Sequence, residues 1–162
     1  MPIAWLNHVS VCARNLSDSI RFYQEVFGAE PVPTPNFGFP VQWLRVGDLQ
    51  LHLFERPEGA PRYAHLAFAV EDLDRVYRLA KERGWTDGET FAYHLNELPG
   101  GQVQLYLRDP AGNLVEVNHP DASALGPEAR ADLRRLADRL PQSEENQRAR
   151  LFLSPRQAAV EA

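Results

Sequence analysis

Apolar residues alternate with polar or small residues in several short segments of the chain, and this period of two predicts β-strands. The segments are 8–12, 41–46, 49–54, 65–70, 102–108 and 114–117. Two further segments, 17–26 and 72–83, repeat apolar side chains at helical spacing, which predicts two amphipathic helices. Asn15 or Ser17 can cap the first helix. The pattern therefore predicts a chain of mixed strands and helices.

These elements occur twice in the same order, about 57 residues apart. In each copy a histidine opens the first strand, a leucine begins the helix, a glycine ends it, and an aromatic-Leu-Arg triplet marks a later strand. The two sets are His8, Leu16, Gly28 and 43–45, and His65, Leu73, Gly84 and 106–108. A duplicated unit with one histidine in each copy can bring both imidazoles to a shared axis, as a metal site requires.

The alternation also separates the two faces of the predicted sheet, because successive strand residues point to opposite sides. One face is aliphatic and is expected to lie on the helices. The other face carries His8, His52, His65, Tyr106 and Glu116. Since three of these side chains are imidazoles from separate strands, a cavity on this face is favoured over a solvated surface.

Composition narrows the classes of partner. A chain of 162 residues with 44% hydrophobic content can bury one core that both copies share. The net charge of -5 argues against nucleic acid as a partner. No run approaches 18 apolar residues, so no membrane partner is expected. The single cysteine, Cys12, cannot form an internal disulfide, which favours a cytoplasmic location.

Three motifs of the chain occur together: the two strand-opening histidines, the Phe22-Tyr23 pair before Gly28, and the segment 106–116 with its Asp-Pro-Ala-Gly-Asn turn. In this combination they resemble the vicinal oxygen chelate superfamily, which includes glyoxalase I, methylmalonyl-CoA epimerase, extradiol dioxygenases, fosfomycin-resistance enzymes and bleomycin-binding proteins. The resemblance covers residues 3–119. It implies an α+β fold, in which tandem βαβββ repeats form a curved, barrel-like mixed sheet around a metal site. The domain is expected to span 1–120, with repeats at 3–57 and 61–119.

Residues 121–162 lie outside the resemblance and form a C-terminal tail. An apolar stripe predicts a C-terminal helix from Gly126 to Leu140, and Pro141 stops it. A short apolar patch at 151–153 follows. Because an isolated helix of this length is marginally stable, the helix is expected to pack on the domain or on a second subunit. A homodimer is the expected assembly.

The resemblance also implies the ligands of the metal, which come from the first and last strands of each half. Carried over to this chain, they are His8, His52, His65 and Glu116. His52 stands where glyoxalases and epimerases place a glutamate or glutamine, and three-ligand members of the family also exist. Three imidazoles and one carboxylate suit Fe, Ni, Co, Zn or Mn better than Mg or Ca.

For the reaction, the resemblance implies a metal that holds two neighbouring oxygens of a small-molecule substrate. In the glyoxalase and epimerase route an enediolate forms and Glu116 is the base. Tyr106 either takes part in the reaction or serves only in packing. The alternatives are an Fe(II) dioxygenase that cleaves a catechol with His8, His65 and Glu116, and a metal-free drug-binding protein or a fosfomycin-resistance-like protein.

Departures from each subfamily restrict these alternatives. Glutathione-dependent glyoxalases have an arginine and an asparagine where this chain has Cys12 and Arg56. The loop 96–99 lacks both the second catalytic histidine of extradiol dioxygenases and the lysine of fosfomycin enzymes. The sequence therefore favours a metal-dependent lyase or isomerase with an unknown substrate.

Overall fold

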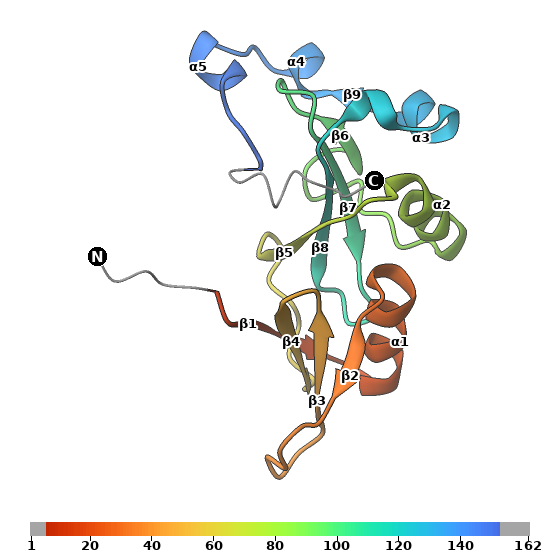
Figure 1. Cartoon of the computed structure of the whole chain (residues 1–162), viewed down its shortest axis with the longest axis vertical. Coiled ribbons are helices and arrows are strands. Elements are labelled where there is room, and N and C mark those ends of the chain that lie inside the picture. Colours follow the sequence, from red (N-terminus) through yellow and green to blue (C-terminus); the bar gives the residue numbers. More distant parts are fainter. Residues whose placement is uncertain (1–5, 153–162) are drawn as a thin grey trace. The chain divides into compact units, whose positions relative to one another are not determined.

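The computed structural model describes residues 6–152, which divide into two compact units (Figure 1). Unit 1 comprises residues up to 64 together with 108–113, and unit 2 comprises 65–107 and the residues from 114 onward. The division separates the two copies of the predicted repeat, apart from the turn 108–113, which belongs to unit 1.

Unit 1 is a four-stranded sheet with one helix. Its elements are β1 (His8–Ala13), α1 (Leu16–Phe27), β2 (Glu30–Val32), β3 (Val41–Val46) and β4 (Leu49–Glu55). The strand order is β1-β4-β3-β2, and β1 runs parallel to β4 while the other pairs are antiparallel. Helix α1 contacts β3 and β4.

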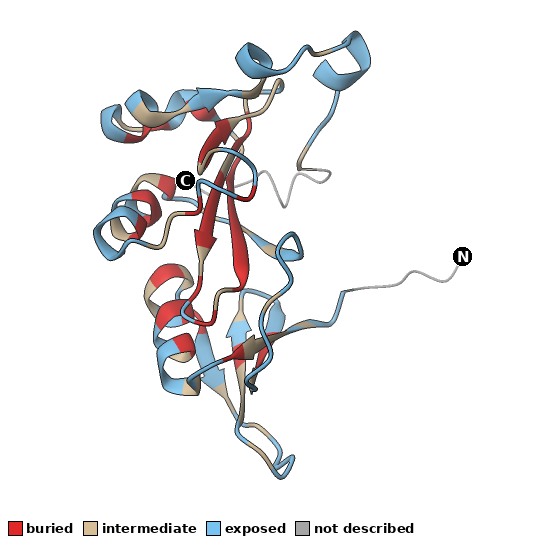
Figure 2. Ribbon diagram, turned by 180° about the vertical axis from the view of Figure 1, so that it is seen from behind, coloured by how far each residue is buried: buried red, intermediate tan, exposed pale blue. Residues whose placement is uncertain are grey.

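Unit 2 repeats this order and adds a C-terminal extension. Its first elements are β5 (His65–Ala69), α2 (Leu73–Arg83), β6 (Leu95–Glu97), β7 (Val103–Arg108) and β8 (Leu114–His119). The extension contains η1 (Ala122–Ala124), α3 (Pro127–Asp132), β9 (Arg134–Arg135), α4 (Leu136–Arg139) and α5 (Glu144–Gln147). The strand order is β5-β8-β7-β6-β9. All six residues of β8 are buried (Figure 2).

The predicted α+β fold with tandem βαβββ repeats is confirmed. In the described part of the chain each unit has an open sheet, and closure of either sheet into a barrel is not observed. None of the described helices is long and apolar enough to cross a membrane.

Both predicted helices begin and end at the predicted signals. The Asn15 side chain accepts a hydrogen bond from the Asp18 amide, and Gly28 ends α1 in the left-handed conformation with a φ of 64°. Gly84 ends α2 in the same way. The buried residues of α2 are Leu73, Val76, Tyr77 and Ala80, a spacing that turns one face of the helix inward.

Two strands lie where the sequence predicts only connections, namely β2 and β6. Each has three residues, too few for an alternating pattern to be visible. Pro31 lies in β2, where it is tolerated because β2 is the edge strand of its sheet. These segments become strands because β2 pairs with β3 and β6 pairs with β7.

The Asp-Pro-Ala-Gly-Asn turn forms hydrogen bonds with both α1 and β1 of unit 1. The buried Asp109 carboxylate accepts hydrogen bonds from the amides of Ala111 and Asn113 and, at 3.0 Å, from the Tyr23 hydroxyl. The Asn113 side-chain amide donates to the carbonyl of Cys12 at 2.7 Å. Burial, and then the nearby Asp109 carboxylate, raises the pKa of Tyr23 well above its usual value, so the hydroxyl stays a donor.

The predicted single helix from Gly126 to Leu140 is wrong. Helix α3 ends at Asp132, and Leu133 is extended with a ψ of 134°. Arg134 and Arg135 then pair in parallel with β6 as strand β9. Residues 151–152 of the predicted apolar patch are described, whereas Leu153 lies outside the described residues.

Contacts of Asp132 explain why the helix stops there. Its carboxylate accepts hydrogen bonds from Tyr77 Oη at 2.7 Å, from Tyr93 Oη, and from His94 Nε2 at 2.9 Å. Continued helix would forgo the strand pairing of β9 and the contact between Arg135 and Glu97 at 3.3 Å. Because α2 provides Tyr77, the extension packs on the domain, one of the two expected positions.

We predict that Tyr23→Phe lowers the free energy of unfolding by about 1.5–3 kcal/mol, the usual range for a hydrogen bond to a charged group. The measurement is urea unfolding. The control is Tyr63→Phe, whose side chain is 57% exposed. Equal midpoints for the two variants would contradict the role of this hydrogen bond.

We also predict that Asp132→Asn lowers stability at neutral pH and leaves the protein below pH 2 nearly unchanged. Burial raises the pKa of Asp132, but hydrogen bonds from Tyr93, Tyr77 and His94 outweigh burial and lower it from 3.8 to about 2. Between pH 2 and pH 3.8 the Asp132 carboxyl binds more protons in the unfolded chain than in the folded protein. The stability that the Asp132 carboxylate contributes is therefore fully present above pH 3.8 and is lost as the pH falls towards 2. The rate of limited proteolysis in the extension measures this pH-dependent stability, and the exposed Asp138→Asn is the control. A loss of stability that is the same at pH 2 and pH 7 would contradict it.

Candidate metal centre

In unit 1 the structure brings His8 and His52 together. Strands β1 and β4 are adjacent, and the register places His8 opposite Gln50 and Ser10 opposite His52, so both histidines lie on one face. Their rings stack with centroids 4.2 Å apart and planes 15° apart. His52 is 6% exposed. Burial, and then the neighbouring His8, lowers the pKa of His52, which keeps this imidazole neutral, the form that binds metals.

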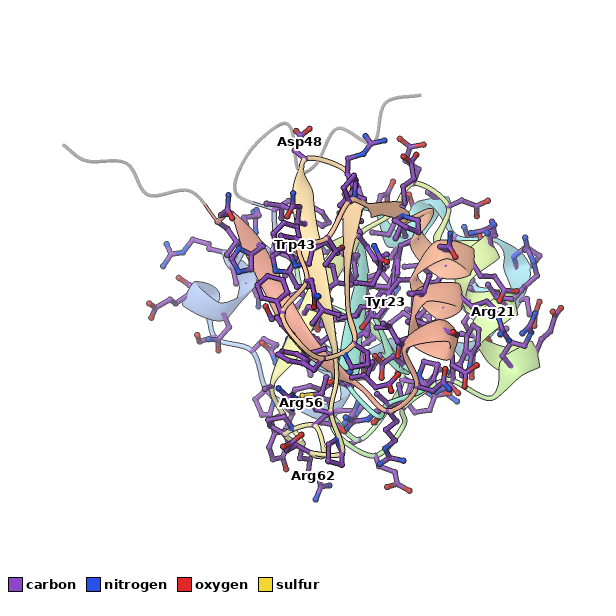
Figure 3. All side chains as sticks on the ribbon, turned by 90° about the horizontal axis from the view of Figure 1, so that it is seen from below. Arg21, Tyr23, Trp43, Asp48, Arg56 and Arg62 are labelled. Atoms are coloured by element: carbon purple, nitrogen blue, oxygen red, sulfur yellow. The ribbon has the colours of Figure 1, made fainter. Side chains whose placement is uncertain are left out.

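His52 is held from both sides. The Trp43 indole stacks on its other face, with centroids 4.4 Å apart, and Gln50 Oε1 lies 2.9 Å from His52 Nε2. Figure 3 labels Trp43 among the side chains of the sheet. Stacked rings direct their nitrogen lone pairs along nearly parallel planes. Binding of one ion by both His8 and His52 therefore requires one imidazole to turn out of the stack.

In unit 2 the structure brings His65 and Glu116 together. They come from the adjacent parallel strands β5 and β8, and His65 Nε2 lies 3.2 Å from Glu116 Oε2. The second carboxylate oxygen, Oε1, accepts a hydrogen bond from Gln104 Nε2 at 2.9 Å. Glu116 is 4% exposed. A carboxylate that is buried to this extent is costly unless a cation or strong hydrogen bonds compensate it.

Tyr106 lies beside this second pair. Burial raises the pKa of Tyr106 strongly, and the charge of Glu116 and a hydrogen bond to it raise that pKa further. The phenol therefore keeps its proton and serves as a donor to the carboxylate. Phe91 contacts the Tyr106 ring at a centroid distance of 4.7 Å, and the His65 ring lies edge-on at 6.4 Å.

The donor chemistry of the two pairs fits a divalent first-row transition metal. It offers imidazole nitrogens, one of them kept neutral by burial, and a buried carboxylate. Between residues 6 and 152, however, no group of three or more His, Cys, Asp or Glu side chains converges closely enough to hold an ion. The four-residue ligand set therefore stays a prediction.

Gln104 and Gln50 are site residues that the sequence reasoning did not single out. Both amides lie on the polar face of their strands and bond directly to a candidate ligand. The sequence shows only that both glutamines lie on the polar face of a strand. Every other polar residue of that face carries the same signal. Their role depends on cross-strand contacts that a single chain pattern does not reveal.

The other two histidines of the chain, His94 and His119, contact residues beyond 120. The His94 side chain is 17% exposed and bonds Asp132 in the extension. His119 is buried at the end of β8, where Nδ1 lies 3.0 Å from the backbone carbonyl of Asp121. Both contacts depend on residues beyond 120, which lie outside the part of the chain that the resemblance covers.

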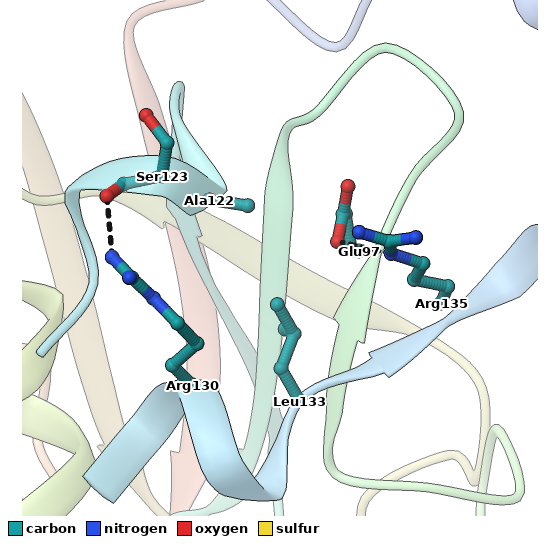
Figure 4. A pocket seen from close by; sticks show the side chains of 6 residues that line it. All are labelled: Glu97, Ala122, Ser123, Arg130, Leu133 and Arg135. Atoms are coloured by element: carbon teal, nitrogen blue, oxygen red, sulfur yellow. Dashed lines mark hydrogen bonds and ion pairs between the residues drawn. The ribbon is translucent and has the colours of Figure 1, made fainter. Parts of the chain in front are cut away.

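A pocket of about 330 Å³ lies in the C-terminal extension of unit 2 (Figure 4). Its arginines are engaged: Arg130 donates to the carbonyls of Ser123 and Leu125, and Arg135 pairs with Glu97. None of the predicted ligands lines this pocket. It is separate from the candidate metal centre.

Comparison with known proteins shows the family. The model of the glyoxalase/bleomycin resistance protein/dioxygenase superfamily matches residues 5–117, and the chain belongs to this superfamily. Glyoxylase I 4 of Arabidopsis thaliana is 32% identical over 133 residues, which cover 75% of this chain and 74% of that protein.

Solved structures share the fold. Fosfomycin resistance protein FosX from Listeria monocytogenes, solved with Mn(II) and a dihydroxypropylphosphonic acid, aligns with a TM-score of 0.59 at 20% identity and covers 80% of this chain and 98% of its own. Lactoylglutathione lyase from Agrobacterium tumefaciens aligns with a TM-score of 0.56 at 23% identity and covers 77% of this chain and 100% of its own. At these identities the likeness concerns the fold alone.

Proposed function

We propose that this chain is a metal-dependent lyase or isomerase that moves a proton between neighbouring carbons of a small substrate. The observation that carries the proposal is the arrangement around Glu116. One carboxylate oxygen lies 3.2 Å from His65 and the other is held by Gln104. The relationship to a protein named glyoxylase I supports this class of reaction.

The proposed ligands are His8, His52, His65 and Glu116. The proposed metal is Fe, Ni, Co, Zn or Mn, in keeping with three imidazoles and one carboxylate. When bound, such an ion would supply Lewis-acid chemistry, which would polarise neighbouring substrate oxygens and acidify the carbon-bound proton beside them. The buried, neutral His52 is the proposed ligand that departs most from the family pattern.

Glu116 is the proposed base. Its carboxylate accepts the proton from the carbon next to the substrate carbonyl and returns it to the neighbouring carbon, so no proton is gained or lost overall. The Gln104 amide fixes Glu116 Oε1, which leaves Oε2 on the His65 side to move the proton. Tyr106 donates a hydrogen bond to the same carboxylate and orients it.

The extradiol dioxygenase alternative requires a catalytic base in the segment around 96–99. Two polar side chains of that segment already have partners in the extension: Asn96 accepts from Arg139 Nη1 at 3.1 Å, and Glu97 pairs with Arg135. This occupation favours proton transfer over ring cleavage. A homodimer and a cytoplasmic location stay predictions from the sequence.

We predict about one transition metal ion per chain by elemental analysis of protein purified without chelator. His52→Ala and Glu116→Gln are expected to weaken zinc binding about 10-fold or more. Substitution of a residue that only supports a ligand typically weakens metal binding about 10- to 100-fold, and loss of the ligand itself should cost at least as much. The matched control is His94→Gln, since His94 bonds Asp132 and is no proposed ligand.

Two results would contradict this prediction. Protein that takes up none of Fe, Ni, Co, Zn or Mn would move the assignment to a metal-free binding protein. Unchanged zinc affinity in His52→Ala, with the fold intact by circular dichroism, would remove His52 from the ligand set and favour a three-ligand site.

We predict metal-dependent exchange of a substrate α-proton with deuterated solvent on a hydroxyketone, a thiohemiacetal or a thioester. Glu116→Gln should abolish exchange, and Tyr106→Phe should slow it while exchange remains detectable, because Tyr106 only orients the base. The Fe(II)-loaded protein should consume no oxygen on a panel of catechols. Oxygen uptake with ring cleavage would overturn the proposed reaction.

A further inference from the structure

Five side-chain rings of unit 1 form a closed circuit of contacts, here called the aromatic face. Its members are Phe37, Phe39, Trp43, His52 and Phe54. The consecutive centroid distances are 4.4 Å for His52 to Trp43, 6.0 Å for Trp43 to Phe37, 6.5 Å for Phe37 to Phe39, 6.0 Å for Phe39 to Phe54 and 6.4 Å for Phe54 to His52. His52 thus belongs to both the proposed metal centre and the aromatic face.

The aromatic face lies on the side of the sheet away from α1. Residue pairs opposite each other in antiparallel strands point to one side, and Trp43 pairs with His52 while Val41 pairs with Phe54. The buried Leu44, Leu51 and Leu53 alternate with them and point to the other side. The aromatic rings are therefore separate from the aliphatic core, and Phe37 is 47% exposed.

A cation lies at the end of the aromatic face that is farther from the histidines. The Arg56 guanidinium stacks over the Phe39 ring with its Cζ 3.9 Å from the centroid, and the Arg56 amide donates to the Ala13 carbonyl. Arg56 is exposed, and no carboxylate among residues 6–152 pairs with it. By contrast, Arg45 on the same face is paired with Glu30. Figure 3 labels Arg56 at the opposite end of the β3–β4 hairpin from Asp48.

We propose that the substrate is a planar aromatic compound with two neighbouring oxygens at one end and a carboxylate at the other. This inference rests on the proposed function, since it places the reacting oxygens at the histidines. The ring of the substrate stacks on the aromatic face, as aromatic pairs prefer at separations of 4.5–7 Å. The carboxylate pairs with Arg56, whose planar fork suits a carboxylate and whose position over Phe39 limits its freedom.

The arrangement disfavours small aliphatic substrates. A two- or three-carbon hydroxyketone can reach the histidines but is too short to contact the exposed Phe37 ring or the Arg56 guanidinium over Phe39. A neutral aromatic substrate can stack on the aromatic face but leaves the Arg56 guanidinium without a counter-ion. Only a compound with both features contacts the aromatic face and Arg56 together.

The test measures binding to the zinc-loaded protein by calorimetry. The probe is 4-(hydroxyacetyl)benzoate, which carries a hydroxyketone and a carboxylate at opposite ends of one ring. Its methyl ester lacks the charge, and hydroxyacetone lacks the ring. We expect the acid to bind most tightly and Arg56→Gln to weaken its binding about 10-fold, as the loss of one charge-assisted hydrogen bond implies, with the ester unaffected. Phe37→Leu should weaken both aromatic ligands about 3-fold or more.

Unit 1 offers matched controls. Arg62 lies over the exposed Tyr63 ring at 5.4 Å, which repeats the pairing of Arg56 with Phe39 outside the aromatic face. Arg62→Gln and Tyr63→Leu should leave the affinities of all three ligands unchanged. Zinc content is measured for every variant, so that a change in ligand affinity is not confused with loss of the metal.

The outcomes separate this inference from the proposed function. Zinc binding without a preference for the acid over the ester overturns the inference and leaves the proposed function intact. Absence of zinc binding overturns the proposed function, whereas a preference for the acid in that protein would still support the aromatic face as a binding surface. A Phe37→Leu variant that changes the oligomeric state in sedimentation, with ligand affinities unaltered, would assign the aromatic face to a second copy and overturn the inference.

Discussion

The parallel pairing of the first and last strands in each βαβββ repeat is the constraint on which the candidate site depends. In unit 1 this pairing aligns β1 with β4, and in unit 2 it aligns β5 with β8. Parallel strands need a crossover connection, and the helix with its following strands provides it. Because the register is specific, His8 meets His52 and His65 meets Glu116. A slip of one residue would turn either member of a pair to the helix side.

Each pair is chemically asymmetric, and this asymmetry suits a metal centre. His52 is buried between Trp43 and His8, which keeps its imidazole neutral, whereas His8 is exposed. Glu116 is buried beside the partly exposed His65. One member of each pair is thus held rigidly by its surroundings, and the other is accessible. Rigid support from Gln50, Gln104 and Trp43 is the kind of second layer of contacts that orients ligands in metalloproteins.

Much of the fold could be predicted from the sequence, because the long elements carry strong local signals. The caps of α1 and α2 and the alternation in β1, β4 and β8 are local properties, and they specified both the elements and their faces. Strands β2 and β6 could not be predicted, because three residues carry no period and cross-strand pairing alone orders them. The break at Leu133 was missed because an apolar stripe at helical spacing does not show that Asp132 is held by Tyr77, Tyr93 and His94.

The same distinction applies to the site. Alternation, which a single chain reveals, places the members of both histidine-containing pairs on one face, and the family resemblance implies that the first and last strands of each half carry them. The partners that tune them, Gln50 and Gln104, depend on which residue of a neighbouring strand lies opposite, and polar residues at strand positions are too common to be singled out. The burial that lowers the pKa of His52 likewise depends on Trp43 stacking over it.

Nitrogen-15 NMR of histidine-labelled protein during zinc addition distinguishes the proposed ligands from the other histidines, because the ring nitrogens of an imidazole change shift strongly when they bind a metal. The chain contains five histidines. We expect the resonances of His8, His52 and His65 to shift together at one equivalent of zinc, while those of His94 and His119 remain in place. Shifts confined to His94 or His119, or no shift at any histidine, would contradict the proposed ligand set.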